Sequence, residues 1–447
     1  MAAAAPAPPV PPVAATAPAD AVVSPENTAV WTDTREPPSV DSQDRANSAL
    51  FTPLAIANGR IQLSHRVVMA PMTRNRGVPL YVGKPNRAWG HDELGATYYA
   101  QRTTPGGLII SEGIYPTVEA SASPCAPGLF LPEQVAGWKA VVDAVHEKGG
   151  YIYAQLWHAG RSCLPHFTGV PAVCPSATPF EGNHKSRYAP PDDDSGAPGR
   201  GEGITMSDHP PKEMTHDDIK RTIGAYVDTA KRAVFECGFD GIEVHGGNGY
   251  LVEQFLSTNI NKRTDEYGGT VAGYCRFPLE LMEALAEAVG GDNVALRLSP
   301  FGLFLQSYGE QRMEIWSHLC QQLKQRIPTM SYIHFIEPRF EQIIDPATKD
   351  TYLKSLGDNI SLEPFRKIMG STPFFVSGGY NDTNVWGVIE SGSADAISIG
   401  RYFTSNPDLV SRLRRGKALT KYERDRFYWV PFDERARGYT DYSPCEE

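Results

Sequence analysis

The stretch DGIEVHGGNGYLVEQFLSTNINKRTDEYGG occupies residues 240–269 and begins with a short apolar strand, Gly241–His245. Alternation along a strand places apolar and polar side chains on opposite faces, so His245 lies on the polar face. Two glycines, Asn248 and Tyr250 follow, and an imidazole, an amide and a phenol thus occur within six residues. A single histidine is usually a satisfied buried group. The cluster, however, can hold a carbonyl oxygen and deliver a proton.

Short apolar strands alternate with amphipathic helices through most of the remaining chain. The expected strands are 65–70, 107–112, 151–157, 241–245, 294–299, 332–337, 373–377 and 396–400. The expected helices are 92–102, 133–148, 216–236, 276–289, 312–326, 362–367, 384–390 and 407–414. Eight strands that alternate with helices predict a parallel sheet closed on itself, the α/β class known as the (β/α)8 or TIM barrel.

Three local features refine this prediction. A doubly wound open sheet would need a dinucleotide fingerprint, but the candidate that begins at Gly247 has Val252 in place of the third glycine. Thr215 and Asp218 have capping-box spacing and predict the start of a helix. The stretch Ser162–Met214 is rich in Pro, Gly, Asp and Ser, so we expect an excursion over the barrel mouth with a hairpin of its own.

Composition limits the possible functions. The 447 residues are 41% hydrophobic, which is enough for one large barrel. A formal net charge of −10 argues against a broad nucleic-acid-binding surface, and no apolar run reaches the length of a membrane span. The seven cysteines are scattered and form no CxxC motif, which indicates reduced thiols rather than a disulfide framework or a zinc site.

The beginning of the chain differs from the rest. Residues 1–48 are rich in Ala and Pro, which predicts a disordered tail ahead of a barrel domain at 49–447. The tail lacks the basic start and the apolar core of a secretory signal, and it is poor in the Arg and Ser of a transit peptide. The chain ends in CEE rather than in a peroxisomal tripeptide. We expect a cytoplasmic location, with organellar targeting by the tail left open.

Glycine turns end the last two expected strands. Gly378 and Gly379 follow the seventh strand, and Gly400 and Arg401 follow the eighth. Barrels of this kind build phosphate sites at these two strand ends from backbone N–H groups. Glycine lets the backbone approach a phosphate, and Arg adds a bidentate charge. The two pairs together therefore indicate a local phosphate site.

Arg297 interrupts an otherwise apolar strand and needs an electron-rich partner. Glu243 could supply one in a salt bridge. A planar heterocycle with carbonyl groups is the other candidate, and Gln155 could bind the same edge of it. Combined with Thr73 after the first strand and the phosphate site, this set describes a flavin mononucleotide (FMN) across the barrel mouth.

The sequence resembles the Old Yellow Enzyme family of FMN-dependent ene-reductases, and within it the 12-oxophytodienoate reductase type. The resemblance extends over about Leu50–Tyr442. The matching motifs in chain order are LSHRVVMAPMTRNR, YYAQRTTPGGLIISEG, QLWHAGR, FDGIEVHGGNGYLVEQFLSTNINKRTDEYGG, ALRLSP, HFIEPR and AISIGRYFTSNPDL.

The resemblance implies a role for each strand-end residue. His245 and Asn248 would bind the substrate carbonyl, and Tyr250 would donate a proton. The substrate pocket would be lined by Trp157, Phe427 and Tyr428. FMN would be tightly but non-covalently bound, with NADPH as reductant. The residues that would hold FMN are Pro71, Met72, Thr73, Gly113, Gln155, Arg297, Gly378, Gly379, Gly400 and Arg401.

The chain also departs from the plant members of this type. Those usually carry a second histidine where this chain has Asn248, and the His/Asn pair matches the yeast-like pattern. Tyr81–His91 and Arg187–Ile204 look longer than the usual loops, so we expect both to border the mouth.

The expected reaction is the NADPH-dependent reduction of the C=C bond of an α,β-unsaturated carbonyl compound, oxophytodienoate-like or another enone. The protein would act as a monomer or homodimer, without nucleic acid or membrane. One alternative is a metal-dependent hydrolase that uses His158, His245 and His334, although few strand ends carry the carboxylates of such a site. The other is a non-catalytic protein that recruits partners through its Pro-rich tail.

Overall fold

The computed structural model describes residues 45–338 and 360–445. Residues 1–44 of the predicted tail and Arg339 of the HFIEPR motif lie outside these ranges. The last residues of the predicted tail are folded. Arg45–Asn47 form a short 3-10 helix, and the Ser48 hydroxyl donates a hydrogen bond of 2.8 Å to Glu390. The boundary at residue 48 stays a prediction.

Eight parallel strands form a closed barrel, and their order around the ring follows the chain. The predicted TIM barrel is thereby confirmed. The strands are β3 (Val67–Met69), β6 (Leu108–Ile114), β7 (Tyr151–Leu156), β10 (Gly241–Gly246), β11 (Val294–Leu298), β12 (Tyr332–Ile336), β13 (Phe374–Ser377) and β14 (Ala396–Ile399).

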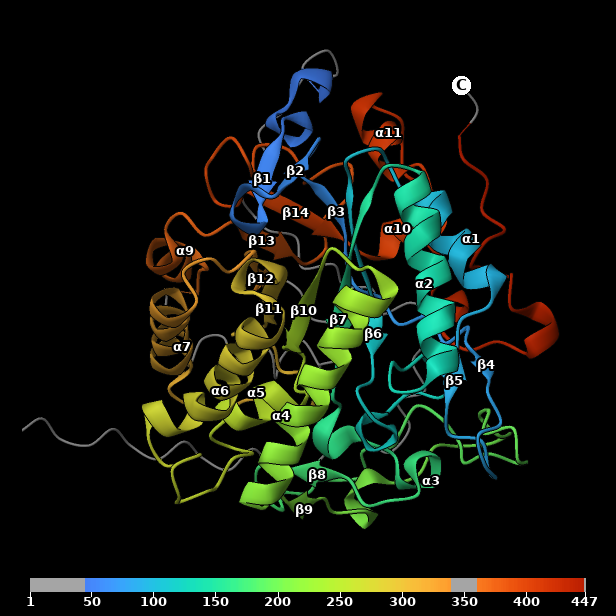
Figure 1. Ribbon diagram of the computed structural model, residues 1–447, viewed down its shortest axis with the longest axis vertical. Coiled ribbons are helices and arrows are strands. Elements are labelled where there is room, and N and C mark those ends of the chain that lie inside the picture. The colour runs from blue at the N-terminus through green and yellow to red at the C-terminus, as the bar shows by residue number, and fades with distance from the viewer. Residues whose placement is uncertain (1–44, 339–359, 446–447) are drawn as a thin grey trace, which may run out of the picture.

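Helices surround the barrel, and Figure 1 shows α2, α4, α6 and α7 in front of the strands. The α-helices outside the insertion are α1 (Glu93–Arg102), α2 (Pro132–Glu147), α4 (His216–Lys231), α5 (Leu251–Leu256), α6 (Val271–Val289), α7 (Arg312–Arg326), α9 (Glu363–Met369), α10 (Arg401–Ser405) and α11 (Leu409–Arg414). The predicted capping box is confirmed, because the Thr215 side chain accepts from Asp218 N and Asp218 accepts from Thr215 N.

Two helix predictions were wrong. Helix α6 begins at Val271 rather than at Arg276, because the Thr270 side chain caps it by accepting from Gly273 N. The segment 384–390, predicted as a helix, is a series of turns. Gly387 adopts a left-handed φ of 78° in its middle, which an α-helix does not allow.

A hairpin closes one end of the barrel. Its strands are β1 (Leu54–Ile56) and β2 (Ile61–Leu63), which pair antiparallel. Their apolar side chains form one buried cluster with residues from the beginnings of the barrel strands: Val68, Leu108, Ile110, Tyr153, Ala295, Tyr332, Phe375 and Ala396. The N-terminal ends of the strands are thus sealed, which leaves the C-terminal ends for chemistry.

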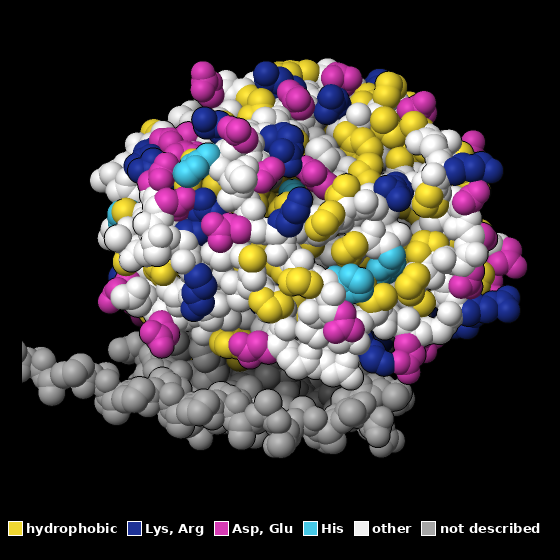
Figure 2. Space-filling model, turned by 90° about the horizontal axis from the view of Figure 1, so that it is seen from below, with side chains coloured by type: hydrophobic (Ala, Val, Ile, Leu, Met, Phe, Trp, Pro, Cys, Tyr) yellow, Lys and Arg dark blue, Asp and Glu magenta, His cyan; other side chains and the backbone are white. Residues whose placement is uncertain are grey.

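The insertion Ser162–Met214 lies at the opposite end from β1 and β2 (Figure 1). It contains α3 (Pro165–Thr168), β8 (Val173–Cys174) and β9 (Lys212–Glu213). Strands β8 and β9 pair in parallel, so they are not the expected hairpin. Between them, however, Lys185 and Thr205 form an antiparallel bridge, so the chain does fold back on itself inside the excursion. The Ser186 N–H donates to the Ile204 carbonyl at 2.8 Å, and the Met206 N–H donates to the His184 carbonyl at 2.7 Å. Seen from this end, basic and acidic side chains are interspersed, and hydrophobic ones gather toward one side (Figure 2).

The two loops that looked long in the sequence contact each other. Residues Tyr81–His91 lie in and beyond the tip of the hairpin between β4 (Val78–Pro79) and β5 (Trp89–Gly90). The backbone N–H of Asn86 donates to the Asp194 carbonyl at 2.9 Å. Within the described residues, no helix is both long and apolar enough to cross a membrane.

Candidate functional site

Strand register brings the predicted site residues to one rim of the barrel. His245 of β10 lies opposite Arg297 of β11, and Gln155 of β7 lies opposite both Glu243 of β10 and Gly113 of β6. Because all eight strands are parallel, their C-terminal ends meet at the same edge. The strand register therefore brings these residues together at one edge of the barrel, as the sequence predicts.

The imidazole, amide and phenol of the 245–250 turn lie close together above β10. The ring centres of His245 and Tyr250 are 5.1 Å apart, and Trp157 lies edge-on to Tyr250 at 4.7 Å. The Asn248 side-chain nitrogen is 3.5 Å from His245 Nε2. Three polar groups and an indole thus surround one small volume.

His245 is a neutral imidazole whose tautomer is set by its neighbours. The Gly247 N–H donates to His245 Nδ1 at 3.4 Å, which leaves the ring proton on Nε2. Burial lowers the pKa of His245 well below its usual range, and the charge of Arg297 lowers it further. His245 Nε2–H and the Asn248 amide are then two donors side by side. An oxygen acceptor between them, such as a substrate carbonyl, satisfies both.

Tyr250 carries its proton at neutral pH. Burial raises the pKa of its phenol, with a further increase from Tyr428 and an opposing effect from the charges of Arg187 and Arg297. A phenol that keeps its proton beside these two hydrogen-bond donors can act as a proton donor toward a bound ligand.

A buried acid, which the sequence analysis missed, holds this turn in place. Asn248 adopts a left-handed φ of 56°, and its backbone N–H donates to Ser299 Oγ at 2.7 Å. Ser299 in turn donates to Glu253 at 2.6 Å, and the Gly249 N–H donates to the same carboxylate oxygen at 3.0 Å. Burial raises the pKa of Glu253, although Arg312 opposes this. The sequence feature that could have revealed Glu253 is an acidic residue within the largely apolar α5.

Arg297 does not form the salt bridge that was one of its two predicted partnerships. Glu243 instead accepts from Gln155 Nε2 at 2.8 Å, from the Tyr332 hydroxyl at 3.1 Å and from His334 Nδ1 at 2.9 Å. Arg297 is 9% exposed and donates to Ser377 Oγ at 3.4 Å. Within residues 45–338 and 360–445, its Nε has no hydrogen-bond partner.

The bare Arg297 donors therefore fit an electron-rich cofactor edge. A buried guanidinium without enough acceptors is costly, and a flavin carbonyl or ring nitrogen at this position would supply them. Thr73 is half-buried, and in the part of the chain that the structure describes its hydroxyl makes no hydrogen bond. Residues on two sides of the rim thus have donors available for FMN.

The predicted glycine positions differ in what they do. A Cβ on Gly113 would lie 2.3 Å from the Trp157 ring, so glycine here admits Trp157. A Cβ on Gly400 would meet the Met72 sulfur at 3.4 Å, which places the end of β14 against the Pro71–Thr73 segment. Gly378 and Gly379 have φ values of 131° and 75°, as a tight turn requires. Arg401 Nη1 donates to the Tyr422 hydroxyl at 3.0 Å.

Two buried arginines, which the sequence analysis also missed, tie the C-terminal segment to this rim. Arg74 donates from Nε to the Phe427 carbonyl at 2.8 Å, and from Nη2 to the Gly438 carbonyl at 2.6 Å. Arg76 donates to the carbonyls of Tyr428 and of Arg435. These contacts explain how Tyr428, far away in sequence, comes close enough to act on Tyr250.

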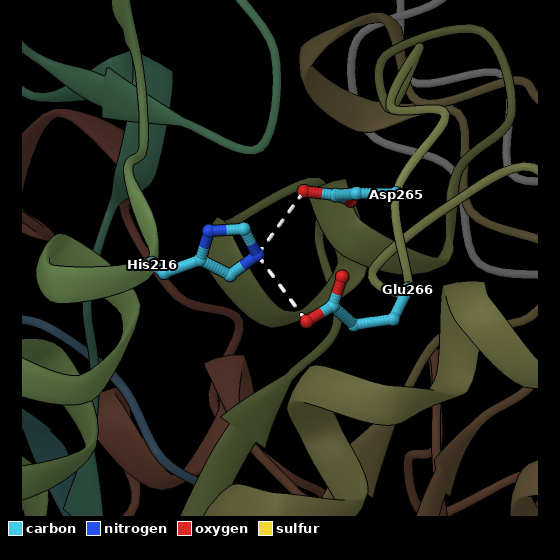
Figure 3. A group of neighbouring side chains, drawn as sticks. All are labelled: His216, Asp265 and Glu266. Atoms are coloured by element: carbon cyan, nitrogen blue, oxygen red, sulfur yellow. Dashed lines mark ion pairs between the residues drawn. The ribbon is translucent and has the colours of Figure 1, made fainter.

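The predicted metal alternative is not supported. Within the described ranges, His158, His245 and His334 do not form a group whose ligand atoms could share one ion. His158 Nδ1 accepts from the Gly160 N–H at 3.0 Å. The group with suitable spacing lies elsewhere (Figure 3) and consists of His216, Asp265 and Glu266.

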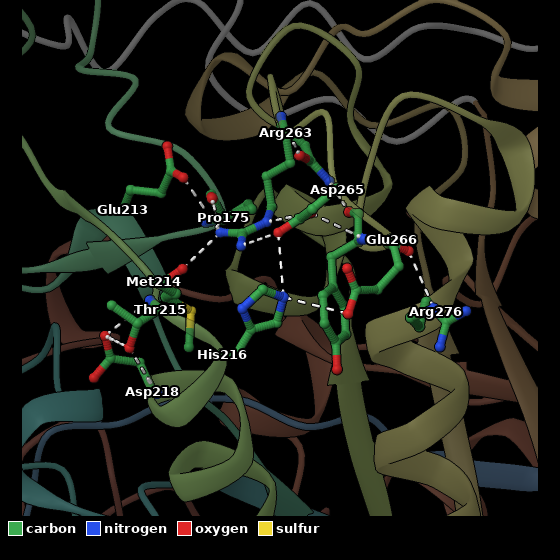
Figure 4. Close-up of polar contacts among 12 residues, drawn as sticks. Pro175, Glu213, Met214, Thr215, His216, Asp218, Arg263, Asp265, Glu266 and Arg276 are labelled. Carbon is green, nitrogen blue, oxygen red and sulfur yellow. Dashed lines mark hydrogen bonds and ion pairs between the residues drawn. The ribbon is translucent and has the colours of Figure 1, made fainter.

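Arg263 connects this group to the insertion. Its guanidinium pairs with Asp265, and Nη1 donates to the carbonyls of Pro175 at 2.9 Å and Met214 at 2.6 Å (Figure 4). Pro175 and Met214 follow β8 and β9, so one side chain binds the backbone directly after each of these two paired strands. His216 Nε2 contacts Asp265 at 3.4 Å from the start of α4. The Asp265 carboxylate is thus already in contact with both Arg263 and His216.

Comparisons with known proteins agree with this geometry. Residues 49–420 match the model of the NADH:flavin oxidoreductase / NADH oxidase family. The chain is 40% identical to flavin oxidoreductase hxnT of Emericella nidulans, over 88% of this chain and 97% of that protein. It is 37% identical to 12-oxophytodienoate reductase 7 of Oryza sativa subsp. japonica, over 91% and 97%. The solved Old Yellow Enzyme homologue from Zymomonas mobilis superimposes with a TM-score of 0.74 at 30% identity, covering 89% of this chain and 100% of that one.

Proposed function

The chain belongs to the NADH:flavin oxidoreductase / NADH oxidase family, and on that premise we propose that it reduces the C=C bond of α,β-unsaturated carbonyl compounds at the expense of NADPH. The expected membership of the Old Yellow Enzyme family is confirmed, and so is the class of FMN-dependent oxidoreductase. The enone substrate, the preference for NADPH and the roles of individual residues are the proposal.

The observation that carries the proposal is the pair of donors above β10. His245 Nε2–H and the Asn248 amide lie 3.5 Å apart, and neither can accept from the other. A carbonyl oxygen bound between them would gain two hydrogen bonds, which strengthen as negative charge develops on the oxygen. Asn248 is held at this position through Ser299 and Glu253.

The cofactor would rest on the rim beside these donors. Arg297 and Gln155 would bind the edge of the flavin, Thr73 would hydrogen-bond it from the segment that follows β3, and the turns after β13 and β14 would hold its phosphate. When bound, FMN supplies the hydride that adds to the β-carbon of the enone. Arg297 would stabilise negative charge at the edge that it contacts.

Tyr250 would complete the reaction by donating its proton to the α-carbon. Burial keeps the phenol protonated, as the direction of its pKa shift requires. The ring packs against Trp157 at 4.7 Å and His245 at 5.1 Å, so its position relative to a carbonyl on His245 is restricted. Proton transfer by such a positioned group typically accelerates a step by about 100-fold or more.

The test is the visible spectrum of the purified protein under anaerobic conditions. We expect a flavin band that bleaches when NADPH is added and returns when cyclohexenone follows. A separate run with NADH in place of NADPH measures the nicotinamide preference. A protein that binds no FMN, or a reduced flavin that cyclohexenone does not reoxidise, would refute the proposed function.

A further inference from the structure

Arg187 is an exposed cation at the edge of the candidate site. It belongs to the insertion, and its guanidinium carbon lies 3.8 Å from the centre of the Tyr428 ring. Among the residues that the structure describes, no carboxylate forms an ion pair with it. Stacking on an aromatic ring holds a guanidinium flat while leaving its N–H groups free along the edge.

The acids near Arg187 in the insertion have other partners. Glu202 is paired with Lys185, and Asp194 with Lys84 at 3.4 Å. Asp192 accepts from the Arg200 backbone N–H at 2.9 Å. None of these three carboxylates is therefore the partner of the Arg187 guanidinium.

Hydrogen bonds of its two neighbours hold the backbone at Arg187 in a defined position. The neighbouring Tyr188 is buried, and its hydroxyl donates to Asn75 Oδ1 at 3.0 Å, next to the segment expected to bind FMN. Ser186 Oγ donates to the Tyr188 carbonyl at 3.0 Å and accepts from Ile204 N at 3.0 Å. The loop is thus anchored on both sides of Arg187, and only its side chain extends into solvent.

Arg187 also lies near the groups that would meet the substrate. Both Arg187 and Arg297 act on the Tyr250 phenol as positive charges, and Tyr428 acts on it as well. The phenol therefore has cations on the flavin side and on the insertion side, in a protein whose formal net charge is −10. A local positive potential of this kind attracts an anionic ligand to the mouth.

Resting on the proposed function, we propose that Arg187, stacked on Tyr428, binds a carboxylate carried by the substrate, so that the preferred substrates are α,β-unsaturated carbonyl compounds with an anionic group remote from the C=C bond. The guanidinium presents two parallel N–H groups, which match the two oxygens of a carboxylate. The aromatic stack reduces the entropy lost when that contact forms. His245 and Asn248 would hold the carbonyl end, so the molecule would be fixed at two points.

The experiment compares one acid with its neutral ester. The probes are 6-(5-oxocyclopent-1-en-1-yl)hexanoate, whose carboxylate is five methylene groups away from the C=C bond, and its methyl ester, used with the FMN-loaded enzyme. In Arg187→Gln we expect the KM for the acid to rise about two- to fivefold, the range for an exposed ion pair, with kcat nearly unchanged. The KM for the ester should stay the same. Arg187→Lys keeps the charge but loses the planar guanidinium, so its KM for the acid should lie between those of the wild type and Arg187→Gln.

Arg200→Gln is the matched control, because Arg200 is another exposed arginine of the insertion. It should leave both KM values unchanged. Salt gives a second signature, since raising it from about 50 mM to about 300 mM should weaken the acid and not the ester in the wild-type enzyme. Calorimetric titration of the oxidised holoenzyme with each probe measures the same preference without turnover.

Three results would overturn the inference. Equal KM values for acid and ester in the wild-type enzyme, together with equal binding by calorimetry, would remove the carboxylate site. An equal rise in the KM for the acid in Arg200→Gln would show that the effect arises from general surface charge and not from a site at Arg187. A rise in the KM for NADPH, but not for the acid, would assign Arg187 to a phosphate of the nicotinamide dinucleotide. Failure to reduce either probe would instead refute the proposed function, and calorimetry would still decide the role of Arg187.

Discussion

Glu112 offers the sharpest prediction, because it is an acid buried at the end of β6 beside the predicted flavin segment. It is 1% exposed, and its Oε2 accepts from the Arg74 backbone N–H at 3.3 Å. Its Oε1 lies 3.5 Å from the Tyr99 hydroxyl and 3.5 Å from His91 Nε2. The change to make is Glu112→Gln, which keeps the shape and removes the charge.

The pKa of Glu112 gives the magnitude. Burial raises it from 4.5 to about 7, against opposing effects from the Arg74 N–H and from the charges of Arg74 and Arg76. Burial also lowers the pKa of His91 to about 3, so His91 is neutral and does not take the proton of Glu112, although its unprotonated ring nitrogen can accept a hydrogen bond. The folded protein thus binds the Glu112 proton more tightly than the unfolded chain does.

The sign follows from that difference. The stabilisation from proton binding is complete below about pH 4.5, declines between about pH 4.5 and 7, and is lost above that range. A shift of this size corresponds to about 3 kcal/mol. Glu112→Gln cannot ionise, so its free energy of unfolding should gain about 3 kcal/mol relative to wild type between about pH 5 and about pH 8.

The assay is chemical denaturation of both proteins at several pH values, read as the difference between them. Buried histidines with lowered pKa values, among them His65 and His158, make both proteins less stable in acid, but their effect cancels in the difference. Glu147→Gln, an exposed change at the end of α2, controls for loss of a carboxylate as such. The reasoning would be refuted if the difference in the free energy of unfolding between Glu112→Gln and wild type did not change across this pH range. It would also be refuted if the advantage of Glu112→Gln grew as the pH fell.

Four further variants test the site. Arg297→Met should raise the dissociation constant of FMN at least about tenfold, measured by flavin fluorescence, without lowering the melting temperature of the apoprotein. In Tyr250→Phe, reoxidation by an enone should slow about 100-fold or more in stopped flow while bleaching by NADPH is unchanged, and equal slowing of both steps would contradict its role. Thr73→Ala should shift the flavin potential by about 20 mV or more in a redox titration, for one lost hydrogen bond. Glu253→Ala should cost about 3 kcal/mol in denaturation, because Ser299 and Arg312 lose their buried partner.

The barrel could be predicted because its signal is periodic and local. Each strand is a short apolar run, and each long helix has a stripe of apolar residues, so the order of elements follows from neighbouring residues alone. The segment 384–390 shows where this fails. Its apolar spacing fits a helix, but Gly387 takes a left-handed φ of 78°, and nothing in the pattern distinguishes it from a helical glycine.

The placement of candidate site residues could be predicted where an unusual residue lies near a strand end, as with His245 and Arg297. It could not be predicted where a side chain binds distant backbone carbonyls. Arg74 and Arg76 bind carbonyls of the C-terminal segment, and Arg263 binds two carbonyls of the insertion, those of Pro175 and Met214. Backbone carbonyls occur at every residue, so no pattern marks the ones that will be used.

The buried polar side chains of the rim fall into two groups that differ in charge. In the first group, the acids Glu243 and Glu253 have their oxygens occupied by donors, among them Gln155, Ser299 and the Gly249 N–H. The second group consists of donors, the Arg297 Nε among them, that have no acceptor within the described residues. Removing one of the acids leaves several groups unsatisfied and should weaken the fold. Removing one of the donors that lack an acceptor relieves a desolvated group and should instead weaken ligand binding. Stability and affinity are therefore expected to separate between Glu253→Ala and Arg297→Met, which a site built only for packing would not allow.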